Sequence, residues 1–379
     1  MKKKIFIFFL LYFFLDLIIT NFLFKKTDFW RLSEKQNPYW RIQSNIYSHD
    51  FAANMEVKEK WQNFYKTIIT NSLGYRDDTK QKIEKVSNNK RVYIIGDSFI
   101  EGMGYDYKHT VAGILKEKLS KNYQILNAGV SSYASGIYYL KTKKLISEGY
   151  KIDYAIIFLD LSDIYDELFY IYSDDKSRII NHDVSKEKKI PFLKRNFYSL
   201  GNFLTENTIL FKILLLMSDK TEIYKNYIKL KFKASKEFNK NFFKTSKEDT
   251  LFYRMLSIDR GAWTRDEDKF KEVKSGIEKT KFNLKRLFKL LDENNIESRL
   301  IIYPWPTQIY YGDKYHQKIW EKFSKENKIN FVNLYSAFDS KDKKKIILDN
   351  FILGDIHWNK QGNKIIANEI LKLKIFNPK

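Results

Sequence analysis

The apolar positions of the chain begin with one long block near the N-terminus. Residues 5–24 form a run of 20 mostly apolar residues with a group of lysines on each side. At about 1.5 Å per residue, a helix of this length spans roughly 30 Å, the thickness of a bilayer's hydrocarbon core. No small residues mark a cleavage site, so the run predicts an uncleaved transmembrane anchor. The leading lysines favour a cytoplasmic tip at residues 1–4 and an extracytoplasmic remainder.

Asp16 interrupts this run. A carboxyl group in the middle of a membrane span costs about 2.5–3.5 kcal/mol on insertion scales. Two explanations are open at this point. Either Asp16 contacts a partner membrane protein, or it is tolerated because it is protonated or locally hydrated.

Five short apolar segments later in the chain have the length and composition of buried strands. We expect these strands at 92–95, 124–126, 154–159, 299–303 and 330–334. Helical patterns alternate with them at 111–119, 138–147, 277–292 and 315–326. This alternation predicts an α/β fold, a doubly wound, flavodoxin-like sheet of five parallel strands with helices on both faces.

Two segments stand apart from this alternation. Residues 25–88 are mixed, polar and aromatic, and we interpret them as a membrane-proximal lead-in to an α/β domain at 89–379. Residues from about 173 to 276 carry charge runs and one apolar stretch, 209–217, which is too short to cross a bilayer as a helix. We expect a mostly helical insertion there. Its apolar stretch packs in a core or, as the second choice, forms a lid or faces a membrane or a partner.

The composition excludes several classes of protein. Apolar residues make up 44% of the 379 residues, which is enough for a sizeable core and excludes a disordered chain. The formal net charge is +22, but the lysines are spread along the chain and do not cluster as in a nucleic-acid-binding protein. We therefore expect no nucleic-acid partner. The absence of cysteine excludes disulfides, thiolate zinc sites and a cysteine nucleophile.

Polar residues follow the predicted strands where each strand ends, and in an open α/β sheet ligands bind at these carboxyl ends. Ser98 follows the first strand, and a serine becomes a nucleophile when a base takes its proton. Among the five histidines, only His357 follows the last predicted strand and has a carboxylate two residues before it. We expect Asp355 to orient His357 as the general base for Ser98.

An oxyanion intermediate needs hydrogen-bond donors as well. The backbone N–H groups of Ser98 and Gly129 are candidates, since a glycine lets the chain approach closely. Each of these residues also has an ordinary explanation. Gly-Asp-Ser often forms only a turn, and Asp355 with His357 would suit a surface pair. No metal site is expected because no two histidines have ligand spacing, and no organic cofactor is implied.

Three blocks of the chain carry a resemblance. Residues 96–102 read Gly-Asp-Ser-Phe-Ile-Glu-Gly, 127–132 read Asn-Ala-Gly-Val-Ser-Ser, and 355–362 read Asp-Ile-His-Trp-Asn-Lys-Gln-Gly. From about residue 70 to 379, the insertion excepted, the chain resembles the SGNH (GDSL-type) hydrolase superfamily. More narrowly, it resembles the membrane-anchored branch with the SGNH-like domains of alginate and polysaccharide O-acetylation proteins.

The resemblance implies roles for individual residues. Ser98 stands in the nucleophile place and Gly129 in the place of the oxyanion glycine. Ser162 followed by Asp163 stands where the family has Asn-Asp. Either Ser162 replaces the Asn side chain as an oxyanion donor, or another donor does, or activity is weak. The Asp-to-His spacing is one residue shorter than in the commoner esterase form, and Asp349 is the reserve candidate for the acid.

These expectations describe a serine-type carbohydrate O-acetyl esterase or O-acyltransferase that works through an acyl-enzyme. The resemblance implies an envelope or secreted polysaccharide, or another acylated sugar, as the substrate. A membrane O-acyltransferase as a partner would favour transfer over hydrolysis, with Asp16 as a contact. The pattern does not separate hydrolysis from transfer. The alternative is a non-catalytic glycan-binding or assembly subunit of a polysaccharide acetylation system that retains the fold.

Overall fold

The computed structural model describes residues 2–27, 41–61, 64–173, 175–182 and 203–376. The chain forms two compact units. One comprises residues 1–38 and 184–250, and the other comprises residues 39–183 and 251–379.

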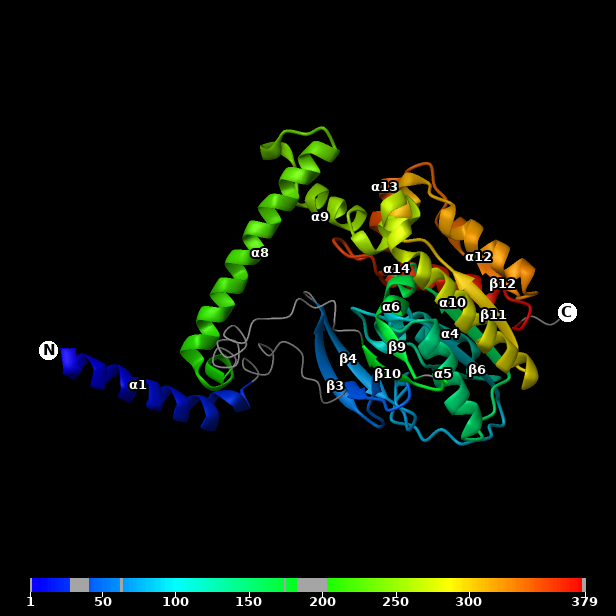
Figure 1. Cartoon of the computed structure of the whole chain (residues 1–379), viewed down its shortest axis with the longest axis horizontal. Helices are drawn as coiled ribbons and strands as arrows, with labels where there is room; N and C mark the ends of the chain where they lie inside the picture. The colour runs from blue at the N-terminus through cyan, green and yellow to red at the C-terminus, as the bar shows by residue number, and fades with distance from the viewer. Residues whose placement is uncertain (1, 28–40, 62–63, 174, 183–202, 377–379) are drawn as a thin grey trace. The chain divides into compact units, whose positions relative to one another are not determined.

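The second unit is built on a mixed sheet of eight strands (Figure 1). Five of them are parallel, and their bounds are β6 (Lys90–Ile95), β7 (Tyr123–Asn127), β8 (Tyr154–Leu159), β11 (Glu297–Ile302) and β12 (Phe331–Asn333). Three antiparallel strands extend one edge: β3 (Glu56–Trp61), β4 (Phe64–Thr70) and β5 (Arg76–Asp77). The order across the sheet is β12-β11-β8-β6-β7-β5-β4-β3, so the direction of strand order reverses between β6 and β8.

The predicted number of strands was wrong for the sheet as a whole. All five expected strands are present, but β3, β4 and β5 come from residues 25–88, the expected lead-in. Strand β3 reads Glu-Val-Lys-Glu-Lys-Trp, so charged residues occupy most of its positions. Such an antiparallel edge strand needs only one buried face and lacks the continuous apolar run of a central parallel strand. From Tyr39 onward the lead-in belongs to the same compact unit as the site.

Helices cover both faces of the sheet. On one face, α5 (Ser135–Ser147) and α10 (Glu267–Glu293) pack side by side and share one apolar cluster with the strands. On the other face, α4 (Val111–Leu119) and α14 (Lys360–Leu371) pack against each other, and their buried residues lie outside that cluster. Alternate residues of each central strand therefore face two different helix layers, as the pleat requires.

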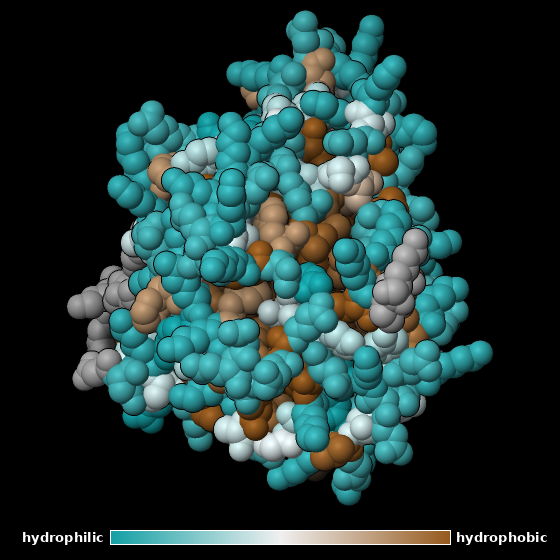
Figure 2. Space-filling model, turned by 90° about the vertical axis from the view of Figure 1, so that its right-hand side faces the viewer, coloured by the Kyte–Doolittle hydropathy of each residue, from teal (hydrophilic) through white to brown (hydrophobic). Residues whose placement is uncertain are grey.

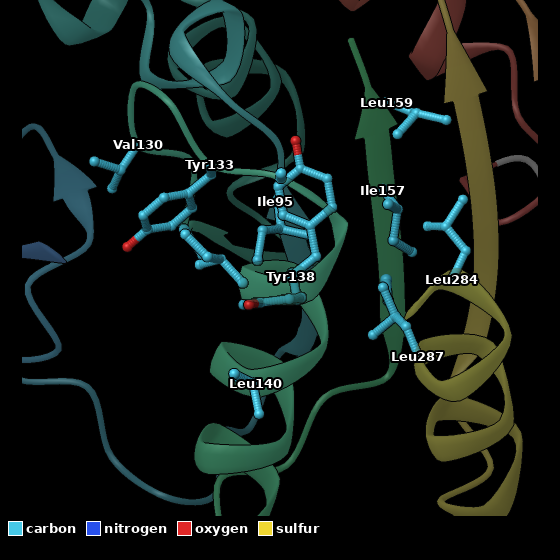
Figure 3. Close-up of a cluster of buried hydrophobic side chains, with 14 of the residues drawn as sticks. Ile95, Val130, Tyr133, Tyr138, Leu140, Ile157, Leu159, Leu284 and Leu287 are labelled. Atoms are coloured by element: carbon cyan, nitrogen blue, oxygen red, sulfur yellow. The ribbon is translucent and has the colours of Figure 1, made fainter. Parts of the chain in front are cut away.

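The core on the α5 and α10 face shows the periodicities that produce it (Figure 3). Strand residues Ile157 and Leu159, two positions apart, point to the same face and are fully buried. Opposite them, Leu284, Leu287 and Leu291 of α10 recur every three or four residues and are also fully buried. This spacing places the three leucines on one side of the helix.

The remaining elements of the second unit are short. They are β1 (Arg41–Gln43), β2 (His49–Phe51), α3 (Ser98–Glu101), α6 (Asp163–Phe169), β9 (Tyr170–Tyr172), β10 (Ile179–His182), α11 (Pro306–Tyr311), α12 (Tyr315–Glu326) and α13 (Lys343–Asn350). Hydrophilic residues cover most of the face seen in Figure 2, and apolar residues show between them.

The first unit contains two long helices, α1 (Lys2–Phe22) and α8 (Ile209–Glu237). Helix α9 (Lys247–Leu256) spans the boundary with the second unit. The insertion is therefore shorter than the expected 173–276, because α10 belongs to the sheet unit. Within the described part of the chain, Lys3–Lys26 is the one segment long and apolar enough to cross a membrane, and a secretion signal meets the same criteria.

Replacing Leu287 with alanine tests the packing of α10 on the sheet. Its side chain is fully buried, so we expect Leu287→Ala to lower the free energy of unfolding by about 2–5 kcal/mol. Urea unfolding followed by tryptophan fluorescence measures the change. Val86 is 60% exposed, and Val86→Ala should change the free energy by less than about 0.5 kcal/mol. Equal losses in the two variants would contradict this core.

Candidate active site

The segment after β6 presents Ser98 at the edge of the sheet. The chain turns sharply there, and a Cβ at Gly96 would lie 2.6 Å from the Ile100 side chain. Helix α3 starts at Ser98, and Asp97 caps it by accepting a hydrogen bond from the Phe99 N–H at 3.0 Å. The serine hydroxyl therefore lies at the carboxyl end of β6, beside the point where the strand order reverses.

Ser98, His357 and Asp355 form one chain of hydrogen bonds. Ser98 Oγ lies 2.8 Å from His357 Nε2, and His357 Nδ1 lies 2.5 Å from Asp355 Oδ1. Asp355 also accepts a hydrogen bond from the His357 backbone N–H at 3.0 Å, which fixes the carboxylate beside the ring. With its proton on Nδ1, the imidazole presents an unprotonated Nε2 to the serine hydroxyl. This geometry can deprotonate an attacking serine.

The charges around His357 favour its protonated form. Burial is the largest single effect and opposes the charge, but Asp355 acts in the other direction through its charge and hydrogen bond. With smaller contributions from Asp97 and Asp160, the result is a pKa of His357 above its ordinary value. Burial likewise favours the neutral form of Asp355, but His357 outweighs it and lowers the pKa of Asp355. The pair is therefore suited to hold an imidazolium during a reaction.

Aromatic rings hold the imidazole in place. The ring of Phe99 lies 4.7 Å from that of His357, and the ring of Trp358 lies 4.7 Å from that of Phe99. On another side, Trp61 meets His357 edge to face at 6.0 Å. Trp61 ends strand β3 and was not among the predicted site residues. No local pattern marks it, because only the folding of β3 onto the sheet edge brings it to the histidine.

Three buried carboxyl groups lie together at the strand ends beside Ser98. One oxygen from each of Asp97, Asp160 and Asp163 lies within 4.8 Å of the others. Burial, with a further contribution from the charge of Asp160, raises the pKa of Asp97 to about 8. Burial followed by its acidic neighbours also raises the pKa of Asp163 well above its ordinary value.

Protein groups provide the hydrogen bonds of this cluster. Trp305 Nε1–H donates to Asp160 at 2.7 Å, and the hydroxyl of Tyr138 donates to Asp163 at 2.8 Å. Burial and the neighbouring acids therefore favour the neutral forms of Asp97 and Asp163. A shift toward neutral carboxyl groups, together with these hydrogen bonds, lowers the repulsion among the three acids.

The predicted oxyanion donors Gly129 and Ser162 are committed to other partners. The Gly129 N–H donates to Asn127 Oδ1 at 3.1 Å, and the Ser162 hydroxyl donates to Asp160 Oδ1 at 2.7 Å. Both donors therefore have protein acceptors in this structure, and their role toward an oxyanion stays a prediction. A short serine side chain beside a buried carboxylate binds that nearer acceptor. Among the described residues, by contrast, the Ser98 N–H has no acceptor, and the Ser98 hydroxyl lies 3.1 Å from Asp97 Oδ2 as well as near His357.

Gly129 has a packing role that explains why a glycine stands there. A Cβ at this position would lie 2.7 Å from Ile100 Cγ2 and 3.0 Å from the Glu101 backbone nitrogen. Both atoms belong to α3, the helix that begins at Ser98. The missing side chain therefore lets the loop after β7 lie directly against the helix of the serine.

Glu101 anchors the same helix and was not singled out from the sequence. It is fully buried, and Arg41 Nη2 lies 2.9 Å and Lys66 Nζ 3.4 Å from its carboxylate. It also accepts a hydrogen bond from the Ser131 N–H at 2.8 Å. Burial favours the neutral acid, but the two cations outweigh it and hold the pKa of Glu101 below its ordinary value. Glu101 thus joins α3 to β1, β4 and the loop after β7.

The other candidate residues lie elsewhere. Asp349, the reserve acid, is exposed and pairs with Lys345 at 2.6 Å, so Asp355 is the carboxylate that contacts His357. His316 is fully buried against the hydroxyl of Tyr335, and burial lowers its pKa to about 3. Its ring therefore packs in the core, away from the Ser98 site.

Removing the carboxylate beside His357 tests the electrostatics of the pair. Asp355→Asn deletes the negative charge that favours the imidazolium, so we expect the pKa of His357 to fall. NMR titration of the imidazole protons measures it directly. Asp349→Asn removes an exposed carboxylate that pairs with exposed Lys345, and it should leave the titration unchanged. A His357 pKa that is the same in all three proteins would contradict the proposed coupling.

Comparisons with known proteins give distant likenesses. No protein-family model and no curated protein matches the chain. Among solved structures, the esterase EstA of Pseudoalteromonas sp. is 12% identical, with 74% of this chain and 94% of that chain covered and a TM-score of 0.36. A catalytic mutant of an acetylxylan esterase from Geobacillus stearothermophilus is 9% identical, with 76% and 95% covered and a TM-score of 0.38. A protein from Desulfitobacterium hafniense, assigned to the lipolytic G-D-S-L family, is 13% identical, with 74% and 98% covered and a TM-score of 0.37.

Proposed function

We propose that this protein is a serine-type O-acyl esterase or O-acyltransferase. One observation carries the proposal: Ser98 Oγ lies 2.8 Å from an imidazole whose other nitrogen lies 2.5 Å from a buried carboxylate. If Asp355 and His357 were only a surface ion pair, no serine hydroxyl would be needed at the other ring nitrogen. Each of the three groups has the neighbour that nucleophilic catalysis requires.

The reaction proceeds in two halves. Ser98 Oγ attacks the carbonyl carbon of an acyl ester while His357 Nε2 takes the hydroxyl proton, and the carbonyl oxygen becomes an oxyanion. When the intermediate collapses, the ester bond breaks and His357 returns the proton to the departing alcohol. Water or a sugar hydroxyl then loses its proton to His357 and attacks the acyl-serine, which releases an acid or a new ester and restores Ser98.

The Ser98 N–H at the start of α3 is the oxyanion donor that the proposal places first. A helix N-terminus favours negative charge, which adds to the hydrogen bond. The Gly129 N–H would donate to the oxyanion only if it gave up its hydrogen bond to Asn127. The Ser162 hydroxyl would do so only if it turned away from Asp160. Losing one oxyanion donor typically costs about 2.7–4 kcal/mol of transition-state stabilisation. With the Ser98 N–H as the one available donor of the three predicted, we therefore expect slow turnover of a simple ester.

The proposed substrate is an O-acylated envelope or secreted polysaccharide, with a sugar hydroxyl as the acceptor if the reaction is transfer. This part rests on the resemblance of the sequence blocks to polysaccharide O-acetylation proteins. Helix α1 is proposed as a membrane anchor with the sheet unit on the extracytoplasmic side, where such glycans are found. A membrane O-acyltransferase is the proposed source of the acyl group for transfer.

A second candidate function is glycan binding without turnover. The hydrogen bonds of Gly129 and Ser162 to neighbouring protein groups favour it, because they remove two of the three predicted oxyanion donors. A glycan-binding or assembly subunit of an acetylation system would need the fold but no oxyanion hole. Turnover that depends on Ser98 separates the two functions.

Turnover of a chromogenic acetate ester tests the catalytic proposal. The full chain in detergent micelles should hydrolyse the ester, and Ser98→Ala should abolish hydrolysis because it removes the hydroxyl whose proton His357 Nε2 would accept. Ser147→Ala is the matched control, since Ser147 ends α5 and bonds only to the backbone of Lys144. Equal rates for wild type and Ser98→Ala would exclude Ser98 as the nucleophile.

The pH dependence of that turnover follows from the state of His357. A general base must be unprotonated, so kcat/KM should rise with pH and reach half its maximum at the pKa of His357 in the free enzyme. Because this pKa lies above the ordinary value of 6.5, the acid limb of the profile should lie above pH 6.5. In Asp355→Asn the residual limb should move to lower pH. An acid limb of kcat/KM with its midpoint below pH 6 in wild type would contradict His357 as the general base.

A further inference from the structure

Asp16 lies against the start of α8 within the first unit. Its Oδ1 accepts a hydrogen bond from the Ile209 N–H at 2.9 Å, and its Oδ2 accepts one from the Leu210 N–H at 3.2 Å. Thr20 Oγ1 accepts from the Ile209 N–H at 3.0 Å and donates to Asp16 at 2.8 Å. Thr208, which precedes α8, makes no side-chain cap of its own. Helix α1 therefore supplies the N-terminal cap of α8.

The contact between the two helices continues toward the end of α1. Lys25 Nζ donates to Asn207 Oδ1 at 3.0 Å, and Asn21 Nδ2 lies 3.4 Å from the Asn207 carbonyl. Asp16 is 6% exposed and Thr20 is fully buried. The segment that leads into α8 therefore lies along α1. Its Asn207 is beside Lys25 and Asn21, and the first residues of α8 are beside Asp16, farther from the end of α1.

The depth of Asp16 in the apolar run places the start of α8 below the surface of a bilayer that α1 crosses. Asp16 precedes the end of the run at residue 24 by eight residues, or about 12 Å along a helix. Inside hydrocarbon, water cannot satisfy the first N–H groups of a helix, so they need partners in the protein. Asp16 and Thr20 provide acceptors for these groups. The contact also gives a buried carboxyl group hydrogen-bond donors and a favourable helix dipole.

The first part of α8 exposes an apolar face of matching length. Leu210, Ile213, Leu214 and Met217 are 40%, 43%, 51% and 60% exposed, and their spacing places them on one side of the helix. Residues 209–217 extend about 13 Å, close to half of the hydrocarbon core. Lys212, the one charged residue of the stretch, is 5% exposed and so does not belong to this face.

We propose that residues 209–217 form a half-span that lies in the bilayer leaflet at the C-terminal end of α1, with lipid acyl chains covering the apolar face. Asp16 and Thr20 hold it there by capping its first turn. The inference rests on the proposed membrane location of α1. It assigns the carboxyl group of Asp16 to a partner within the chain, and it makes the insertion part of the anchor.

Lipid contact can be measured residue by residue because the chain contains no cysteine. Single variants Leu11→Cys in α1, Leu214→Cys in α8 and Phe243→Cys are labelled with bimane and reconstituted as full chains in phosphatidylcholine vesicles. Phe243 is 87% exposed and lies outside α8, so it serves as the control. Lipids brominated on their acyl chains should quench bimane at positions 11 and 214 and leave position 243 bright.

The three positions separate the possible failures. Quenching at 11 and 214 but not at 243 supports the half-span. Quenching at 11 alone would overturn the half-span while the anchor stands. Equal fluorescence at all three positions with and without brominated lipid would overturn both the anchor and the inference drawn from it, and the proposed chemistry at Ser98 would be unaffected.

Variants at Asp16 test the cap. Asp16→Leu leaves the N–H groups of residues 209 and 210 without the carboxylate, so quenching at position 214 should fall to the level of position 243. Quenching at position 11 should persist. Asp16→Asn keeps one carbonyl acceptor and should retain most of the quenching at 214. If Asp16→Leu left that quenching unchanged, the role assigned to Asp16 would be wrong.

Discussion

The hydrogen bond between Ser98 and His357 joins side chains 259 positions apart and depends on the whole sheet unit. Strand β6 delivers the serine at the point where strand order reverses, and the loop before α14 delivers the histidine. Asp355 sets the orientation of the imidazole, and the ring of Phe99, the residue after the serine, packs against it. A serine without this base would be an ordinary hydroxyl.

Buried ion pairs connect the helix of the serine to strands that precede β6 in the sequence. Arg41 and Lys66 reach Glu101 on the helix of the serine, and Lys141 reaches Asp50 in β2 at 2.8 Å. Removing one partner of such a pair leaves an uncompensated buried charge and is strongly destabilising. Strands β1 and β4 therefore act as a support for the helix that carries Ser98.

Much of the site could be predicted because its residues follow apolar strands, and parallel strands present their ends at one edge. Ser98 and His357 could be identified from this order and Asp355 from its spacing to the histidine, and the structure brings the three side chains together. The edge strand β3 could not, because its charged residues carry no apolar run. Nor could the direction of the Ser162 hydroxyl, which depends on the position of the Asp160 carboxylate in space.

Identifying the residue that a serine-reactive phosphonate modifies tests the central claim most directly. The full chain would be incubated with a fluorophosphonate, digested, and mapped by mass spectrometry. The account predicts one phosphonylated peptide with the modification on Ser98, and loss of labelling in His357→Ala because the base is missing. Modification of a different serine, or labelling that persists without His357, would contradict it.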